Sequence, residues 1–187
     1  MWTSKKLAIA FALGGLGGLV LDQIHVRFGV LGYPSSLMFG QPWWVGPNFG
    51  FGLLLMLQGS VSFVRGPATR THPSSFVVGG VCFVAAYLAT GLFYTQPWLL
   101  LLGLMLAFIP RLVLEPGRSS RSVRLAHALV LGFSGAAYEG ALSSFGIFSY
   151  ARPDVALVPI WLPALYLHGS PILLDVTFET LVRADRS

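Results

Sequence analysis

Charged residues are scarce in this chain. They make up 10% of its 187 residues, whereas 55% of the residues are apolar. An average soluble domain is about 25% charged. A globule of this size keeps much of its surface exposed, so it cannot hide that many apolar side chains from water. The composition therefore excludes an ordinary soluble protein. It predicts an integral, multi-pass membrane protein whose surface is solvated mainly by lipid.

Several common site signatures are also missing. Cys82 is the only cysteine, so no intrachain disulfide can form. The sequence contains no HExxH metal motif and no GxSxG nucleophile motif, and its four histidines are scattered over separate segments. The basic residues stand singly or in small groups between apolar runs, without a basic stripe interleaved with aromatics, which argues against a nucleic-acid partner. We therefore predict no catalytic residue, no metal ligand and no cofactor other than a bound lipid.

Long apolar runs dominate what remains. A spanning helix needs about 20 mostly apolar residues. Six runs meet this requirement, and breakers such as Gly66-Pro67 and Pro116-Gly117 separate them. The expected spans are Leu7–Ile24, Trp44–Val64, Phe76–Phe93, Trp98–Leu114, Leu125–Phe148 and Val155–Leu181. The fold class is thus all-α, a single polytopic bundle of six transmembrane helices over residues 1–187.

The basic residues predict the orientation of this bundle, because Lys and Arg in short loops favour the cytoplasmic side. Alternate crossings place ten of the 12 basic residues on the side of the N-terminus and leave only Arg27 and Arg152 on the other. Both termini are therefore expected in the cytoplasm. An N-terminal signal peptide is the alternative, but the apolar run continues to Asp22 and the chain goes on as a membrane protein, so we expect a retained helix. Lys5 and Lys6 are the only lysines, and this arginine bias favours a bacterial cytoplasmic membrane, or the endoplasmic reticulum in a eukaryote.

Glycines cluster in the first span. The cluster is Gly14, Gly15, Gly17 and Gly18, and Gly14 and Gly18 are four residues apart, a spacing that lets helices approach closely in lipid. They predict a self-association surface and hence a homo-oligomer. The alternative is that they reflect only the ordinary glycine content of membrane helices.

Ionisable side chains inside spans are costly and are candidates for function. The depth of each residue within its predicted span separates most of these candidates, since ionisable groups near a span end can reach the headgroups. Glu139, His168 and Asp175 are the deepest of the set. His168 and Asp175 are seven residues apart, so one continuous helix would place them on one face. The full set is Asp22, His25, Arg111, His127, Glu139, His168, Asp175 and Glu179.

These deep polar groups allow three interpretations. They could hold a metal that activates water in an intramembrane lipid hydrolase. They could line a cavity that binds a lipid headgroup or hydroxyl. They could also be structural, paired with one another or with the backbone. The scattered histidines make the first interpretation the weakest. A small transporter is a further alternative, although the sequence lacks two matching halves with interrupted helices.

Prolines favour a cavity. Pro159, Pro163 and Pro171 each remove a backbone donor, so we expect them to kink the sixth span. Broken backbone is tolerated in a membrane where it is buried in protein or lines a cavity. The second span opens with the kink-prone "VGPNFGFG". Two bent helices in a six-helix bundle would leave an apolar pocket with few polar groups, which suits a lipid guest.

One stretch near the C-terminus resembles a known family. "GIFSYARPDVALVPIWLP" is similar to the Insig (insulin-induced gene) family, in which a Gly, an aromatic pair, Tyr-x-x-Pro-Asp and Trp-Leu-Pro follow at fixed distances. "PWWVGP", with Trp43, resembles a second family motif that opens the second span. The matching residues of the first motif are Gly146, Phe148, Tyr150, Pro153, Asp154, Trp161, Leu162 and Pro163.

The resemblance implies a non-enzymatic protein that binds a sterol or similar lipid between six spans and holds a partner membrane protein when ligand is bound. The family has Asp-Arg-Ser after its fourth span, but this chain has "LEPGRSSRS", with no aspartate. This difference puts the animal type of partnership in doubt. The family's ligand-associated glutamine corresponds to Gln96, with a small shift in register. A bacterial relative would then hold diacylglycerol or another membrane lipid in place of an oxysterol.

Together these arguments predict a membrane-embedded lipid sensor. Its walls come from the second to sixth spans, and a lipid filling the cavity favours one helix arrangement over another. The predicted ligand-binding residues are Trp44, Phe49, Phe51, Gln96, Tyr138, Glu139 and His168. The partners expected are a membrane lipid, a further copy of the chain and another membrane protein.

Overall fold

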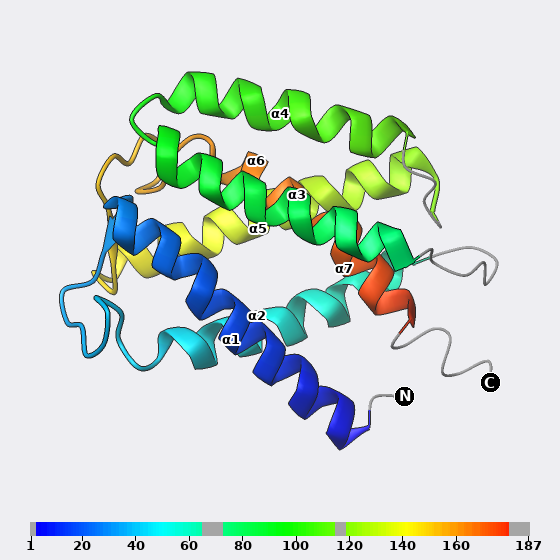
Figure 1. Cartoon of the computed structure of the whole chain (residues 1–187), viewed down its shortest axis with the longest axis horizontal. Coiled ribbons are helices and arrows are strands. Elements are labelled where there is room, and N and C mark those ends of the chain that lie inside the picture. The colour runs from blue at the N-terminus through cyan, green and yellow to red at the C-terminus, as the bar shows by residue number, and fades with distance from the viewer. Residues whose placement is uncertain (1–2, 65–72, 115–118, 180–187) are drawn as a thin grey trace.

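The computed structural model describes residues 3–64, 73–114 and 119–179. They form a helical bundle, so the predicted all-α fold class is confirmed (Figure 1). The helices are α1 (Ser4–Phe28), α2 (Val45–Ser60), α3 (Pro73–Phe93), α4 (Pro97–Leu114), α5 (Arg121–Ser144), α6 (Leu162–Leu167) and α7 (Ser170–Thr177). A short 3-10 turn, η1 (Val61–Phe63), extends α2, and the strands β1 (Leu31–Gly32) and β2 (Ser149–Tyr150) pair antiparallel.

Three helices in the described part of the chain are long and apolar enough to cross a membrane: Ser4–Phe28, Phe76–Phe93 and Pro97–Leu114. Large apolar side chains are exposed on them, as a lipid solvent allows; Val20 is 68% exposed and Leu99 is 61% exposed. α2 is shorter, and α5 carries two arginines, a histidine and Glu139. Neither helix is among these three candidate spans, so the crossing of the membrane by α2 and α5 stays a prediction.

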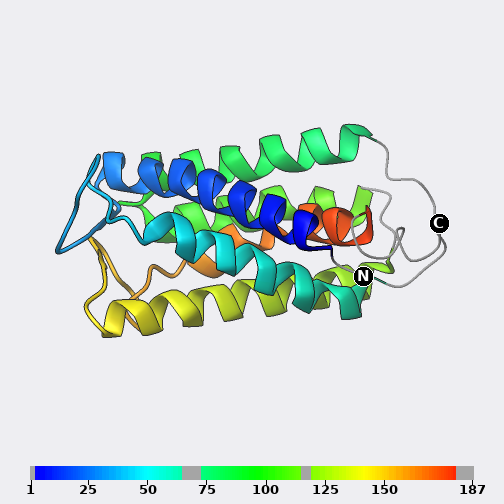
Figure 2. The same ribbon diagram turned by 90° about the horizontal axis from the view of Figure 1, so that it is seen from below.

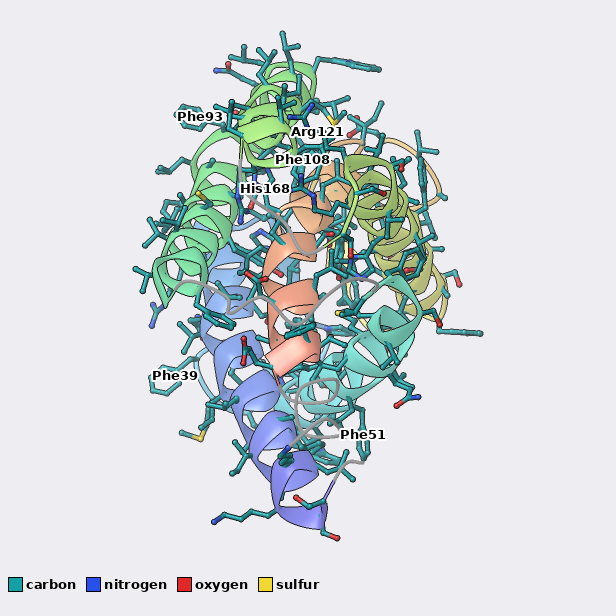
Figure 3. The ribbon with its side chains drawn as sticks, turned by 90° about the vertical axis from the view of Figure 1, so that its right-hand side faces the viewer. Phe39, Phe51, Phe93, Phe108, Arg121 and His168 are labelled. Carbon is teal, nitrogen blue, oxygen red and sulfur yellow. The ribbon has the colours of Figure 1, made fainter. Side chains whose placement is uncertain are left out.

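The helices run in a similar direction when they are seen from below (Figure 2), whereas α1 and α2 cross each other in the view of Figure 1. α6 and α7 follow one another near the middle of the bundle, and the other helices surround them (Figure 3). The start of α1 and the end of α7 lie at the same end of the molecule, while the paired strands lie at the opposite end (Figure 2). Arg65, Arg70, Arg118, Arg183 and Arg186 lie outside the described residues, so the cytoplasmic placement of the termini stays a prediction.

The sixth span differs from the expected single helix. Val155–Trp161 is not helical, and a turn at His168–Gly169 separates α6 from α7. Pro163 and Pro171 lie in the first turns of these two helices. A first turn tolerates proline because its N–H groups have no intrahelical partner. The prolines therefore begin helices, and the prediction that they kink one helix was wrong. The predicted end at Leu181 lies outside the described residues.

The glycines of α1 pack within the molecule. A Cβ at Gly18 would lie 2.1 Å from Cγ of Phe49, and one at Gly15 would lie 3.0 Å from the carbonyl oxygen of Gly46. Gly14 likewise faces Leu53 on α2. Small residues thus bring the backbones of α1 and α2 together. The prediction that this face serves self-association was wrong for these three residues, and only Gly17 has no atom within 4 Å of its Cβ position.

This packing predicts opposite outcomes for two similar substitutions. We expect Gly18→Val to lower the stability of the bundle by about 1–3 kcal/mol, the usual cost of overpacking a close contact. Gly17→Val should change it by less than about 0.5 kcal/mol, as at exposed sites in general. Unfolding of the purified protein in mixed micelles of increasing SDS content measures both. Equal effects of the two variants would contradict the close α1–α2 contact.

Candidate functional site

A cavity of about 320 Å³ lies between α1, α2 and α5, near the end of the bundle that carries the strands. Its volume falls within the range of small-molecule sites. Most of its wall is apolar or aromatic, supplied by Phe49, Phe51 and Leu55 of α2 and by Leu131 and other residues of α5. Phe51 and Leu55 are also 61% and 75% exposed, so the cavity reaches the outer face of the bundle. A guest could therefore enter from the surrounding lipid.

Glu139 is the acidic residue that α5 presents to this cavity. The Tyr150 hydroxyl donates to its Oε2 atom, and the Tyr166 hydroxyl donates to its Oε1 atom. β2 positions Tyr150 and α6 positions Tyr166, so one carboxylate joins three segments. Burial, followed by the charge of Glu139, raises the pKa of Tyr150 well above its usual value, which keeps the hydroxyl protonated and able to donate.

Asp22 of α1 is a second carboxylate in the same cavity. The Tyr33 hydroxyl lies 3.0 Å from each of its oxygens, and Nε2 of Gln41 donates to Oδ2 at 2.7 Å. Gln41 also donates to the carbonyl of Leu19 at 3.1 Å. Burial and the charge of Asp22 raise the pKa of Tyr33. Asp22 lies near the predicted end of the first span, where a side chain can reach the headgroups, and no local pattern in the sequence marks its partners.

Asn48 and Tyr138 join α2 to α5 across the cavity. The Tyr138 hydroxyl donates to Oδ1 of Asn48, and both side chains line the cavity wall. Tyr138 is 49% exposed, so this hydrogen bond lies at the outer margin of the cavity. It joins α2 to α5 through polar groups, as the contact between Ser60 and His127 does elsewhere along the same two helices.

The predicted ligand-binding residues divide into two groups. Trp44, Phe49, Phe51, Tyr138 and Glu139 all line the α1–α2–α5 cavity. The other two lie elsewhere: His168 borders a different cleft, and Gln96 is exposed at the turn between α3 and α4. Aromatic and acidic residues from segments far apart in the sequence are thus brought together, whereas the expected Glu139–His168 pair is not part of one cavity.

The cleft at His168 has a volume of about 450 Å³ and lies between α3 and α4. Its wall is almost wholly apolar. His168 is 2% exposed, Nε2 of its ring lies 3.0 Å from the carbonyl of Leu104, and Nδ1 is buried without a hydrogen-bond partner. Nη1 of Arg111 donates to the His168 carbonyl at 3.1 Å, at the break between α6 and α7.

The remaining candidates have structural partners. His127 is held between two serines: its Nδ1 lies 2.7 Å from Oγ of Ser170, and its Nε2 lies 2.9 Å from Oγ of Ser60. Nε2 of His25 lies 2.8 Å from Oγ1 of Thr90. Asp175 and Glu179 line neither cavity. Within residues 3–64, 73–114 and 119–179, no three His, Cys, Asp or Glu side chains are grouped as a metal site requires.

The motif residues fasten the end of the bundle next to the cavity. Gly146 has φ +68°, the left-handed conformation that ends α5 and that glycine adopts freely. Oδ2 of Asp154 accepts from the backbone N–H of Ile160 at 2.9 Å. Trp161 is 1% exposed and its ring lies against Tyr150, with a centroid distance of 6.4 Å. Leu162 is buried and Pro163 opens α6, whereas Trp43 and Pro153 are exposed.

No protein-family model matches the chain, and no curated protein matches it. Solved structures do match the chain. The crystal structure of MvINS, a mycobacterial Insig homologue from Mycobacterium vanbaalenii, matches with a TM-score of 0.79 and 22% identity over 99% of this chain and 97% of that chain. The chain has the fold of an Insig homologue. A cross-linked MvINS trimer matches with the same TM-score and 21% identity, over 97% of this chain and 96% of that chain.

The MvINS match confirms, at the level of the fold, the Insig resemblance that the two motifs predicted. Both structures are covered almost end to end, so the match extends through α3 and α4, which carry neither motif. The Insig-type fold is a helical membrane-protein fold, in agreement with the apolar helices of this chain. Glu115 and Arg118 of the segment that departs from the family lie outside the described residues.

Proposed function

We propose that this protein is a non-enzymatic, membrane-embedded lipid sensor, and that the α1–α2–α5 cavity holds a diacylglycerol-like or sterol-like ligand. One observation carries the proposal: an apolar and aromatic cavity that reaches the lipid-facing surface contains two carboxylates held by tyrosines. Apolar contact would supply most of the affinity. Hydrogen bonds to a ligand hydroxyl, each worth about 0.5–1.5 kcal/mol net, would supply selection.

We infer that binding of the ligand changes the arrangement of the helices. Asp22 and its partners connect α1 to the following loop, and Glu139 connects α5 to β2 and α6. A guest between these groups would favour one arrangement of α1, α2 and α5 over another. A second copy of the chain or another membrane protein would then respond to that arrangement. The trimer of MvINS supports a homo-oligomer, and the bacterial cytoplasmic membrane is the proposed location.

Lipid analysis of the purified protein tests this function. We expect mass spectrometry to find one lipid class enriched at least tenfold over the bulk membrane extract, at about one molecule per chain. Glu139→Ala should reduce that enrichment severalfold, because it removes an acceptor and frees two buried tyrosine hydroxyls. Asp175→Ala, outside both cavities, is the matched control. A lipid profile identical to that of the bulk membrane would contradict the proposal.

A further inference from the structure

A short hairpin between β1 and α2 exposes apolar side chains. Met38 and Gln41 pair across a two-residue turn, and the Gln41 N–H donates to the Met38 carbonyl at 2.9 Å. Residues 37–41, the first hairpin, include no charged residue. Leu37, Met38 and Phe39 are 74%, 68% and 69% exposed. Three adjacent side chains of this kind mark a surface that contacts something other than water.

The first hairpin is folded back along α1. Nε2 of Gln23 donates to the carbonyl of Phe39 at 3.0 Å, and a Cβ at Gly40 would lie 2.8 Å from Cγ1 of Val26. Gln23 precedes Phe28, the last residue of α1, by five positions, which is about 7.5 Å along a helix. The tip therefore lies beside the helix and does not cover its end.

The tip continues an exposed apolar face of α1, which is one of the candidate spans. Leu16 and Val20 are four residues apart and Gln23 follows Val20 by three, so these side chains lie on one face of the helix. Leu16 and Val20 are 65% and 68% exposed. Figure 3 views the molecule along its long axis and shows Phe39 at the outer margin, pointing away from the helices. The surroundings of this face in a membrane are lipid.

The polar groups of the first hairpin are bonded within the protein. Lipid offers no hydrogen bonds, so a segment that enters it must satisfy its backbone internally. Met38 and Gln41 exchange backbone hydrogen bonds, and Gln23 donates to the carbonyl of Phe39. The Gln41 side chain is bonded to Asp22 of α1. The hairpin thus presents apolar side chains outward and holds its polar groups against the bundle.

Phe39 has a backbone conformation that its side chain does not favour. Its φ is +54° and that of Gly40 is +84°, so both central residues of the turn have positive φ, as a type I′ turn requires. Glycine, asparagine and aspartate are the usual residues there, and a bulky residue at positive φ is rare. Formation of the turn therefore does not explain a phenylalanine at this position, whereas a contact made by the ring outside the bundle does.

A second hairpin, residues 155–158, repeats this arrangement. Val155 and Val158 exchange backbone hydrogen bonds across Ala156 and Leu157, whose φ values are +48° and +65°. Val155 is 60% exposed and Leu157 is 48% exposed. A Cβ at Gly140 would lie 2.8 Å from the carbonyl oxygen of Ala156, so this hairpin is also folded back against a helix, α5. The same features in two segments far apart in the sequence indicate a shared role.

We propose that both hairpin tips are interfacial anchors, which insert apolar side chains into the lipid leaflet at the strand end of the bundle. Amphipathic helices that lie in a membrane interface are buried about 5–10 Å into the boundary between headgroups and acyl chains. The first tip, about 7.5 Å from the end of α1, has a comparable depth when that helix ends at the headgroups. The partner is the surrounding membrane and not the guest of the cavity, so the inference does not depend on the proposed function.

Single fluorescent labels test the insertion in the full-length protein reconstituted into phosphatidylcholine vesicles. Cys82→Ser removes the only native cysteine, and Phe39→Cys, Leu157→Cys or Ser149→Cys then supplies one labelling position. Ser149 is exposed on β2, at the same end of the bundle, and is the matched control. We expect phosphatidylcholine with a doxyl group near the start of its acyl chain to quench the labels at positions 39 and 157 severalfold more strongly than the control. Aqueous iodide should give the reverse order.

Two results would overturn the anchoring. Equal quenching at the three positions would mean that the tips lie no deeper than the control on β2. Protection of the tips from both quenchers would mean that protein covers them, such as a second copy of the chain. If Phe39→Cys does not fold, Leu37→Cys reports on the same tip, because Leu37 is 74% exposed and does not have a positive φ.

Discussion

Replacing Gly52 with phenylalanine is expected to empty the cavity of lipid while leaving the bundle folded. Gly52 lies on α2 and lines the cavity, and a Cβ at this position has no atom within 4 Å. The first atom of a larger side chain would therefore meet no protein atom, and a benzyl group would extend into the cavity of about 320 Å³. We expect at least a tenfold loss of co-purifying lipid, measured by quantitative lipid mass spectrometry.

Gly17→Phe is the matched control for Gly52→Phe. Gly17 also has open space at its Cβ position, but it lies on α1 and does not line the cavity. Both variants should unfold within a few degrees of the wild-type protein when the thermal transition is followed in detergent. If Gly52→Phe retained the full lipid content with an unchanged transition, the guest would have to bind elsewhere, and the α1–α2–α5 cavity would not be the site.

Trp161→Ala is expected to destabilise the protein strongly. The Trp161 side chain is 1% exposed and fits between Tyr150 and His25, at centroid distances of 6.4 and 5.9 Å. Removing a buried tryptophan in a water-soluble core costs about 3–5 kcal/mol, part of it as a cavity term. Lipid replaces some of the lost transfer free energy in a membrane, so we expect about 3 kcal/mol. SDS-induced unfolding in mixed micelles measures the loss.

Trp43→Ala is the control for Trp161→Ala, because Trp43 is 73% exposed. Its removal should change the free energy of unfolding by less than about 0.5 kcal/mol, as at other exposed positions. The Trp161 variant should also lose bound lipid, since Tyr150 is fixed both by Trp161 and by Glu139. Comparable stability of the two variants would show that the motif tryptophan does not hold the cavity end of the bundle together.

Much of the framework could be predicted because it depends on composition and periodicity. The length of the apolar runs predicted α3 and α4 closely. The predicted spans were Phe76–Phe93 and Trp98–Leu114, and the observed helices are Pro73–Phe93 and Pro97–Leu114. The predicted span Leu125–Phe148 ends four residues beyond the observed end of α5 at Ser144. The stop follows from Gly146, whose positive φ ends the helix before the apolar run ends.

The failures share one cause, which is that they concern contacts between segments. The sixth span was expected as one kinked helix because proline is a breaker inside a helix, yet Pro163 and Pro171 occupy first turns. Gly15 and Gly18 fit the spacing for association with another chain, but α2 of the same chain occupies their face. A local pattern indicates that a close approach occurs and does not say which helix approaches.

The amino-acid sequence alone determined that the surface is solvated mainly by lipid, that the fold class is all-α and that the chain carries Insig-type motifs. These features depend on side-chain polarity and on spacing along the chain. Only the tertiary structure decided that Asp22 shares a cavity with Glu139 and that His168 does not. Hydrogen bonds from Tyr33, Gln41, Tyr150 and Tyr166 make that pairing possible, and they join residues up to 27 positions apart. Such partners are selected by packing in three dimensions, which no periodicity in the chain records.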